Sequence, residues 1–211
     1  MAGPRITVKS VADILLNSKS NTNTTTILHD QKYPAADPQK FRTPYYQGAI
    51  AAIRQYYAGA NDTKILAHWQ NKLLSIKNEA RRTNNVRALD VFAASSLSKR
   101  KLTPTVNKRY LATINGVTIS LSADMQATQS GALQIVYFHC RATSLDLSVA
   151  DMIANVANLV LSANGVVATP MQIEVMDLCV GKSLRASAWN STTQKNLAVR
   201  AQAIAQLWTQ I

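Results

Sequence analysis

One carboxylate of the chain follows small polar residues at strand spacing. Ser120, Ser122 and Asp124 alternate with apolar residues, so they share the polar face of a predicted strand. That placement suits a carboxylate that lines a cleft. The alternative is a strand-end carboxylate that pairs with a neighbouring basic group, and the sequence leaves both open. Two other acids, Glu174 and Asp177, fall on opposite faces of a later strand, so without a bulge they could not both line one site.

A histidine and a cysteine are adjacent at His139-Cys140. Neighbouring strand residues point to opposite faces, which argues against a Cys–His nucleophile pair. We expect Cys140 to be a buried, unreactive thiol. His29 and His68 fall in a polar segment and on a basic helix face, and we expect both at the surface. No Walker loop, GxGxxG, GxSxG or metal-ligand His/Cys spacing occurs, and two cysteines are too few for a disulfide scaffold or a zinc cluster.

Positive charge is concentrated in the first half of the chain. The 211 residues include 23 Lys and Arg against 11 Asp and Glu, a formal net charge of +12. Residues 1–110 hold 18 of the basic and 6 of the acidic residues, whereas residues 111–211 hold 5 of each. Such an excess attracts polyanions, of which nucleic acid is the commonest. The sequence therefore predicts a DNA- or RNA-binding surface before residue 110, with a merely solvated surface as the alternative.

The candidates for phosphate contact are basic residues of this half. They are Arg42, Arg54, Lys64, Lys72, Lys77, Arg81, Arg82, Lys99, Arg100, Lys101, Lys108 and Arg109. Aromatic residues between positions 33 and 57 are interleaved with several of them, and such mixtures can stack bases while cations hold phosphates. Helical spacing assigns Tyr46 and Tyr57 to the core instead.

The predicted elements divide the chain into three regions. Residues 1–42 combine a short element, with Ser10 as its cap, and a flexible linker that includes the polar run at 17–26. Residues 43–104 form a basic helical region, and residues 105–211 an α/β core. The apolar fraction of 47% is that of a globular protein. No run approaches the roughly 18 apolar residues that span a bilayer, so we expect a soluble, cytoplasmic protein without a membrane partner.

Helix signals mark the middle region. Thr43-Pro44 begins a helix that Gly59 ends, Asp62 caps a second helix, and a third runs from about Val86 to Ala94. From Tyr110 the apolar period changes to two, and Asn115-Gly116 predicts a tight turn between two strands because both residues adopt positive φ angles readily.

The remaining elements complete an α/β or α+β fold. They are a nearly all-apolar third strand at 133–140, a helix from Ser148 to Gly165, a hairpin around Gly181-Lys182 and a helix capped at Ser191. We therefore expect a central mixed sheet of about five strands, flanked by helices and preceded by the basic helical region.

This order of elements, together with the segments Gly116–Asp124 and Leu133–His139, resembles the PD-(D/E)XK nuclease superfamily, nearest to its exonuclease-like branch. The resemblance covers residues 105–209. In that family an acid near the end of the second strand and an acid-x-Lys at the end of the third hold Mg²⁺ and activate water at the scissile phosphate. Asp124 matches the first acid by position.

The rest of the family's motif is missing. Tyr137 stands at the second acid and His139 at the lysine. Tyrosine is a poor Mg²⁺ ligand at neutral pH, and histidine carries at most part of a lysine's charge. Family members sometimes recruit an acid from the helix ahead of the sheet, and Glu79 is the candidate by order. The resemblance implies a nuclease fold that has lost its metal site and uses no cofactor.

The sequence thus predicts a protein that binds the phosphate backbone of nucleic acid through its basic N-terminal half, without catalysis. Two alternatives stay open. One is an active Mg²⁺-dependent nuclease, a phosphodiester hydrolase in which Asp124 and a relocated acid such as Glu79 hold the metal. The other is an assembly or scaffold subunit whose basic face docks an acidic protein.

Overall fold

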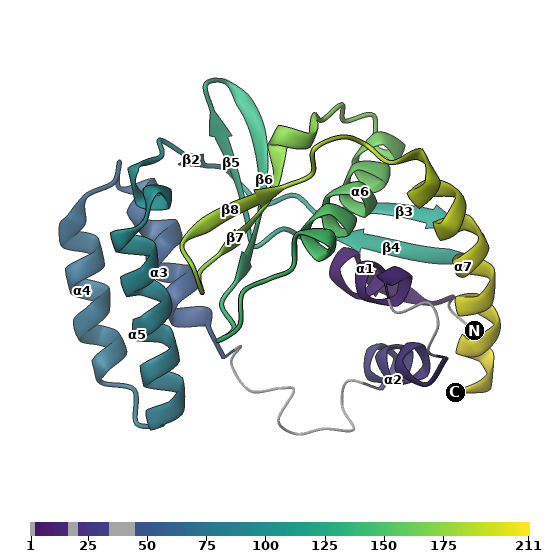
Figure 1. The fold of residues 1–211 in the computed structure, drawn as a ribbon, viewed down its shortest axis with the longest axis horizontal. Helices are drawn as coiled ribbons and strands as arrows, with labels where there is room; N and C mark the ends of the chain where they lie inside the picture. Colours follow the sequence, from purple (N-terminus) through teal and green to yellow (C-terminus); the bar gives the residue numbers. More distant parts are fainter. Residues whose placement is uncertain (1–2, 17–20, 34–44) are drawn as a thin grey trace.

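The computed structural model describes residues 3–16, 21–33 and 45–211 and has an α+β fold (Figure 1). A three-stranded sheet has the order β1-β4-β3, and a five-stranded sheet has the order β2-β5-β6-β7-β8. The strands are β1 (Arg5–Thr7), β2 (Thr103–Pro104), β3 (Tyr110–Ile114), β4 (Val117–Leu121), β5 (Met125–Gln129), β6 (Ala132–His139), β7 (Ile173–Asp177) and β8 (Lys182–Arg185). The predicted mixed sheet of about five strands is confirmed.

Helices flank the five-stranded sheet, as expected. The helices of the described chain are α1 (Val8–Leu16), α2 (Asn21–Lys32), α3 (Gln47–Ala58), α4 (Thr63–Leu74), α5 (Glu79–Ala94), α6 (Leu147–Ala163) and α7 (Ser191–Gln210), with short 3-10 turns η2 (Ser96–Lys99) and η3 (Pro170–Gln172), and α2 and α7 lie beside the smaller sheet. None of the helices in the described ranges is long and apolar enough to cross a membrane.

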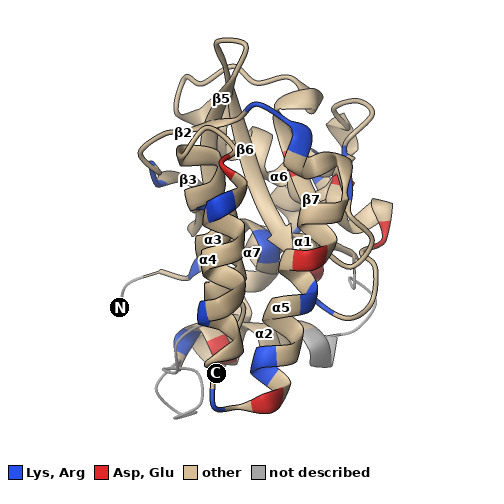
Figure 2. Ribbon diagram, turned by 90° about the vertical axis from the view of Figure 1, so that its left-hand side faces the viewer, with Lys and Arg blue, Asp and Glu red and all other residues tan. Residues whose placement is uncertain are grey.

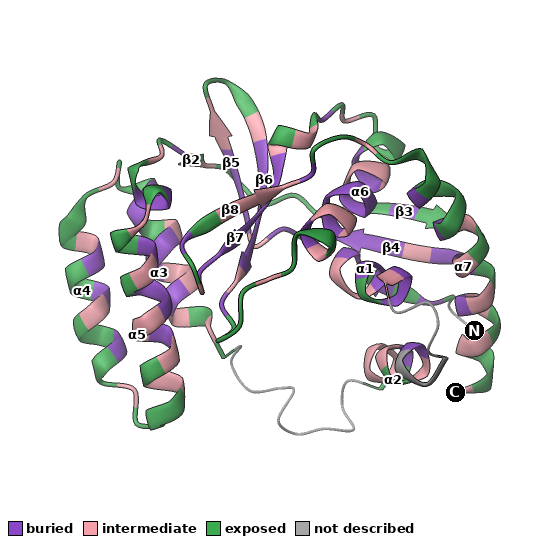
Figure 3. Cartoon of the chain, viewed as in Figure 1, coloured by how far each residue is buried: buried purple, intermediate pink, exposed green. Residues whose placement is uncertain are grey.

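Strand β6 lies in the middle of the five-stranded sheet, as its apolar sequence predicts. It pairs antiparallel with β5 and parallel with β7, and α6 makes the crossover between β6 and β7. Alternate side chains of β6 enter different hydrophobic clusters. Val136 and Phe138 pack with residues of α3, α4 and α5, whereas Ile135 and Tyr137 pack with residues of α1 and α6. The sheet therefore separates two helical layers, and buried residues follow its strands and the helix sides that face it (Figure 3).

The predicted tight turn is confirmed, but its hairpin belongs to the smaller sheet. Asn115 and Gly116 have φ angles of 46° and 82° and connect β3 to β4. On its other side β4 pairs with β1 in parallel, so the start of the chain completes this sheet. Strand β5, which the sequence analysis does not anticipate, follows β4 after a connection of three residues and joins the other sheet.

Two predictions for the N-terminal region are wrong. Helix α1 begins at Val8, where Thr7 Oγ1 accepts from the Ser10 backbone N–H, so Ser10 is not the cap. The polar run is helical from Asn21 onward, because α2 buries Leu28 in the same cluster as α1. Residues 17–20, the remainder of the linker at 34–42 and the Thr43-Pro44 helix start lie outside the described residues.

Several predicted helix ends move by a few residues. Asp62 caps α4 through the Lys64 N–H at 2.9 Å, and Gly59 ends α3, both as predicted. Helix α5 instead begins at Glu79, because the side chain of Asn78 caps it. The caps of α6 and α7 are Asp146 and Asn190 rather than the serines that follow them.

Candidate functional site

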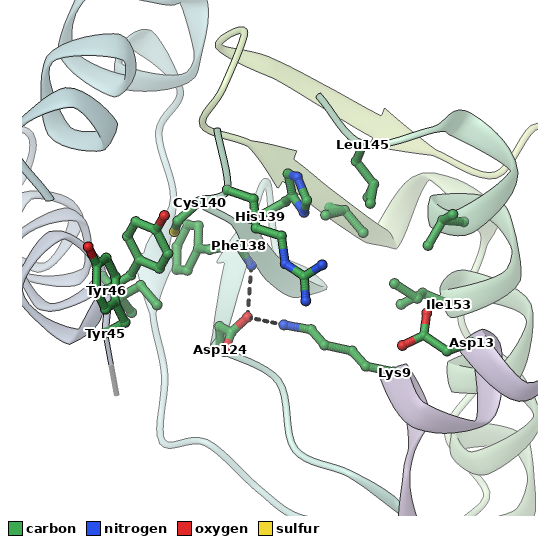
Figure 4. A pocket seen from close by; sticks show the side chains of 14 residues that line it. Lys9, Asp13, Tyr45, Tyr46, Asp124, Phe138, His139, Cys140, Leu145 and Ile153 are labelled. Atoms are coloured by element: carbon green, nitrogen blue, oxygen red, sulfur yellow. Dashed lines mark hydrogen bonds and ion pairs between the residues drawn. The ribbon is translucent and has the colours of Figure 1, made fainter. Parts of the chain in front are cut away.

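The carboxyl ends of β6 and β7 form one edge of the five-stranded sheet. In open sheets with parallel strands, ligands bind beyond this edge. A cavity of about 330 Å³ lies here, between α1, α3, α6 and the residues that follow β6 (Figure 4). Its polar lining comes from Lys9, Asp13, Tyr45, Tyr46, Asp124, His139 and Arg141. The fold therefore places a polar cavity where such sheets bind ligands.

Asp124 lies in the three-residue connection between β4 and β5, where the chain passes from one sheet to the other. One of its oxygens, Oδ2, accepts from Lys9 Nζ and from the Phe138 backbone N–H, both at 2.8 Å (Figure 4). The side chains of Lys9 and Asp124 are 42% and 27% exposed. Asp124 thus combines both sequence interpretations, since it lines a cavity and also pairs with a base.

Tyr137 and His139 share the strand face that Asp124 adjoins, as their spacing predicts. Tyr137 is 2% exposed, and its hydroxyl has no hydrogen-bond partner among the described residues. Burial, and secondarily the negative charge of Asp124, raise the pKa of Tyr137. His139 Nε2 is 2.8 Å from the Thr143 carbonyl oxygen. The structure therefore brings Asp124 and Tyr137 together around the Lys9 ammonium group and places His139 in the lining of the same cavity as Asp124.

Lys9, Asp13 and Arg141 contribute three charges that the sequence analysis does not anticipate. Lys9 and Asp13 lie four residues apart on α1, and both point toward the cavity (Figure 4). Burial raises the pKa of Asp13, and the positive charges of Arg141 and Lys9 oppose that shift. The i, i+4 spacing of Lys9 and Asp13 is the one sequence signal, but 115 residues separate Lys9 from Asp124.

The residues around Asp124 do not supply the group of carboxylates that a Mg²⁺ site needs. Over the described ranges, no three His, Cys, Asp or Glu side chains lie close enough together to hold a metal ion. Glu79 is an exposed residue in the first turn of α5 and does not line the cavity beside Asp124, so the structure does not bring the predicted pair together. The ammonium group of Lys9 instead supplies the positive charge next to Asp124.

Glu174 and Asp177 lie on opposite faces of β7, as predicted. Each carboxylate accepts hydrogen bonds from its own group of neighbouring residues. Asp177 is buried and accepts from the Ser144 hydroxyl at 2.7 Å and from the Leu145 and Cys179 backbone N–H groups at 2.8 Å. The bonds to Ser144 and Leu145 fix the end of the loop that leads to α6, and the bond to Cys179 fixes the turn that follows β7.

The basic residues that the sequence predicts to contact phosphate differ in their exposure in the structure. Arg42 is outside the described residues. The exposed side chains are Lys64, Lys72, Lys77, Lys99, Lys101, Lys108 and Arg109, and the half-buried ones are Arg54, Arg81, Arg82 and Arg100. Arg100 donates two hydrogen bonds to Glu174, at 2.6 and 2.8 Å, so its guanidinium joins η2 to the sheet rather than facing solvent.

The exposed lysines of α4, η2 and the segments beside them, together with the half-buried Arg81 and Arg82 of α5, spread over one side of the molecule. Figure 2 shows Lys and Arg residues on both helices and on the segment above them. The side-chain amide of Asn61 donates to the carbonyl oxygens of Ser98 and Arg100, which brings the start of α4 beside η2. We call Lys64, Lys72, Lys77, Arg81, Arg82, Lys99 and Lys101 the basic helical face.

The tyrosines of α3 are not part of this face. Tyr56 and Tyr57 are buried against Phe92, and their hydroxyls donate to the carbonyl oxygens of Ser98 and Leu97. They therefore hold η2 in place and are not available to stack on bases. Tyr46 lines the cavity beside Asp124.

Comparisons of the chain with protein-family models, with curated proteins and with solved structures found no match. The functional conclusions below therefore rest on the residues and their geometry.

Proposed function

We propose that this protein binds nucleic acid through the basic helical face, chiefly by contacts to phosphates. The observation that carries the proposal is an uncompensated array of exposed cations. Over the described ranges, no ion pair forms at Lys64, Lys72, Lys77, Lys99 or Lys101. Exposed cations without acidic partners attract a polyanion and release its counterions on binding.

Acidic residues are scarce around this array. Residues 45–109 contain twelve Lys and Arg but three acids, Asp62, Glu79 and Asp90. Asp62 and Glu79 lie at the N-terminal ends of α4 and α5, where a negative charge stabilises the helix. The few acids in this layer thus serve the helices and leave most of its positive charge uncompensated.

The length of the array suits a polymer. Helix α4 has 12 residues, which corresponds to about 18 Å. Lys64 and Lys99 lie near one end of the α4–α5 pair, and Lys77 and Arg82 near the other, where the Arg82 guanidinium donates to the Ile76 carbonyl oxygen. Phosphates of one strand of DNA recur about every 3.4 Å along the axis, so several could contact this face together.

We further propose that binding occurs without cleavage, on a PD-(D/E)XK-like fold whose motif has degenerated. Two observations support this. Strands β6 and β7 with the α6 crossover follow the strand–helix–strand order that the resemblance implies from the third strand onward, whereas β4, the strand before Asp124, belongs to the other sheet. At the motif positions, Asp124 adjoins Tyr137 and a lysine ammonium group instead of a second carboxylate. The proposal includes a cytoplasmic location, where DNA and RNA are accessible.

Charge reversal on the basic helical face tests the proposal. Fluorescence anisotropy with single- and double-stranded DNA and with RNA would compare the wild type with Lys72→Glu/Lys77→Glu and Lys99→Glu/Lys101→Glu variants. Arg100 is left unchanged because it pairs with the buried Glu174. We expect each double variant to weaken binding at least tenfold at low salt, since two phosphate contacts become repulsive.

The matched control is Arg5→Glu/Lys195→Glu, which makes the same charge change at exposed positions on β1 and α7. It should retain most of the affinity. Absence of binding at low salt, or equal losses in the control and the two test variants, would overturn the proposal. The first result would instead favour an acidic protein as the partner of this face.

A further inference from the structure

A second, smaller cavity lies on the other side of Asp124. Its volume is about 150 Å³, and it is enclosed by the start of α1, the end of β4 and the middle of β6. Lys9 and Asp124 line both cavities, whereas Tyr137 lines only the smaller one. The basic helical face does not contribute to this cavity.

The N-terminal end of a nine-residue helix borders the cavity. Thr7, Val8 and Lys9, the cap and first two residues of α1, are part of the lining. The N–H groups and the partial positive charge at a helix N-terminus favour an anion. The Lys9 ammonium group adds a full positive charge at the same place.

Three hydroxyl groups in the lining lack partners. In the described part of the chain the hydroxyls of Tyr137, Ser120 and Ser122 make no hydrogen bond; the Tyr137 hydroxyl is fully buried, whereas Ser122 is exposed. A buried polar group without a partner costs about 1–3 kcal/mol, so one that persists calls for an explanation. A ligand with several oxygens in this cavity would offer acceptors to these hydroxyls.

Asp124 determines which oxyanion fits. Its Oδ2 atom already accepts two hydrogen bonds, from Lys9 and Phe138, whereas Oδ1 accepts none among the described residues. A carboxylate oxygen repels a fully ionised anion and accepts from an O–H group. Free phosphate carries a proton near neutral pH, a terminal phosphate monoester carries one below its second pKa of about 6, and sulfate carries none.

We propose that this cavity binds a protonated phosphate group, held by Lys9, the start of α1 and the hydroxyls of Ser120, Ser122 and Tyr137, with Asp124 accepting the phosphate proton. The group is either free phosphate or the terminal phosphate of a nucleic-acid strand. The second source rests on the proposed function, whereas the phosphate site itself does not.

Calorimetric titration with inorganic phosphate, and with sulfate at the same ionic strength, tests the site. We expect phosphate to bind at least tenfold more tightly than sulfate.

Tyr137→Phe should weaken phosphate binding about tenfold or more, since it removes a hydrogen bond to a charged group. The thermal midpoint of Tyr137→Phe without phosphate should be equal to or above that of the wild type, because the unpartnered hydroxyl is gone. Tyr110→Phe, a half-buried tyrosine outside the cavity, is the control.

Three results would overturn the phosphate site. They are no phosphate binding at millimolar concentration, equal binding of phosphate and sulfate, and full affinity in Tyr137→Phe. Lys9→Met is a second test variant, and it should abolish phosphate binding because it removes the ammonium group from the cavity. If that variant does not fold, the comparison of Tyr137→Phe with Tyr110→Phe decides alone.

Oligonucleotides of one sequence, with and without a terminal phosphate, distinguish the two sources. If the cavity binds the end of a strand, the wild type should bind the phosphorylated oligonucleotide more tightly than the unphosphorylated one. Tyr137→Phe should show no such preference, and added free phosphate should remove the preference of the wild type. Phosphate binding without any preference would show that the ligand is a small phosphate. Phosphate binding with no oligonucleotide binding at all would overturn the proposed function and leave the phosphate site standing.

Discussion

Glu174 is a buried carboxylate held between two arginines. It is 1% exposed and accepts from Arg100, from Arg185 at 2.9 and 3.1 Å, and from the Ser183 hydroxyl. Removal of its charge would leave two guanidinium groups without their counterion inside the protein. We therefore expect Glu174→Gln to lower the free energy of unfolding by about 3 kcal/mol, as measured by urea denaturation.

Glu79→Gln is the matched control for that change, because it makes the same chemical replacement at an exposed helix start. It should cost about 0.3–1 kcal/mol, the usual contribution of a charge near a helix terminus. Similar losses in the two variants would show that the buried pairs contribute no more than a surface charge.

The two cysteines should differ in reactivity. Cys140 is 5% exposed, and burial raises the pKa of its thiol to about 12. At pH 8 about one molecule in ten thousand would then carry the reactive thiolate at this position. We expect iodoacetamide to modify the half-buried Cys179 first and Cys140 only after unfolding, which peptide mass mapping can follow. Equal labelling rates in the folded protein would contradict this expectation.

At the scale of elements, the turn between β7 and β8 packs against the end of α5. Gly181 has a φ angle of 67°, and a Cβ atom added there would lie 2.6 Å from the Cβ of Ser95. The backbone fixes that neighbouring atom, so the two elements would have to separate. We expect Gly181→Ala to destabilise the protein by about 2–4 kcal/mol, from backbone strain and overpacking together.

Gly116→Ala separates these two causes. Gly116 has a φ angle of 82° in the β3–β4 turn, but nothing lies within 4 Å of an added Cβ. It should therefore show the backbone strain alone, about 1–2 kcal/mol. Denaturation curves for both variants would measure the difference, and equal losses would show that the contact with Ser95 adapts without cost.

For the whole molecule, the uneven charge predicts a strong dependence of binding on salt. If the basic helical face contacts duplex phosphates, the logarithm of the binding constant should fall linearly with the logarithm of salt concentration. Each neutralised contact, such as Lys72→Gln, should reduce the size of that slope by about 0.9. Anisotropy titrations at several salt concentrations measure the slope. A slope that changes equally in Lys195→Gln would place the phosphates elsewhere on the surface.

Much of the fold could be predicted from the sequence because its signals are local. Asn115-Gly116 defines a turn over two residues, Asp62 caps the helix that follows it, and the apolar run of β6 marks a central strand. Strand β5 and helix α2 could not be predicted in this way. Their sequences, MQATQ and the Thr-rich run before Leu28, have weak intrinsic preferences, so packing decides their structure.

The candidate site likewise has one part that the sequence predicts and another part that only the tertiary structure shows. The shared strand face of Tyr137 and His139 follows from the two-residue period of strands, whereas Asp124 reaches them from the connection between the two sheets. Two decisive partners do not follow from any local pattern: 115 residues separate Lys9 from Asp124, and 74 separate Arg100 from Glu174.

The sequence by itself determined that the positive charge lies before residue 110, since charge is a sum over residues and needs no coordinates. Only the tertiary structure decided which cations remain exposed. An ion pair depends on the distance between two side chains, and the topology of the sheets sets that distance for residues far apart in the chain.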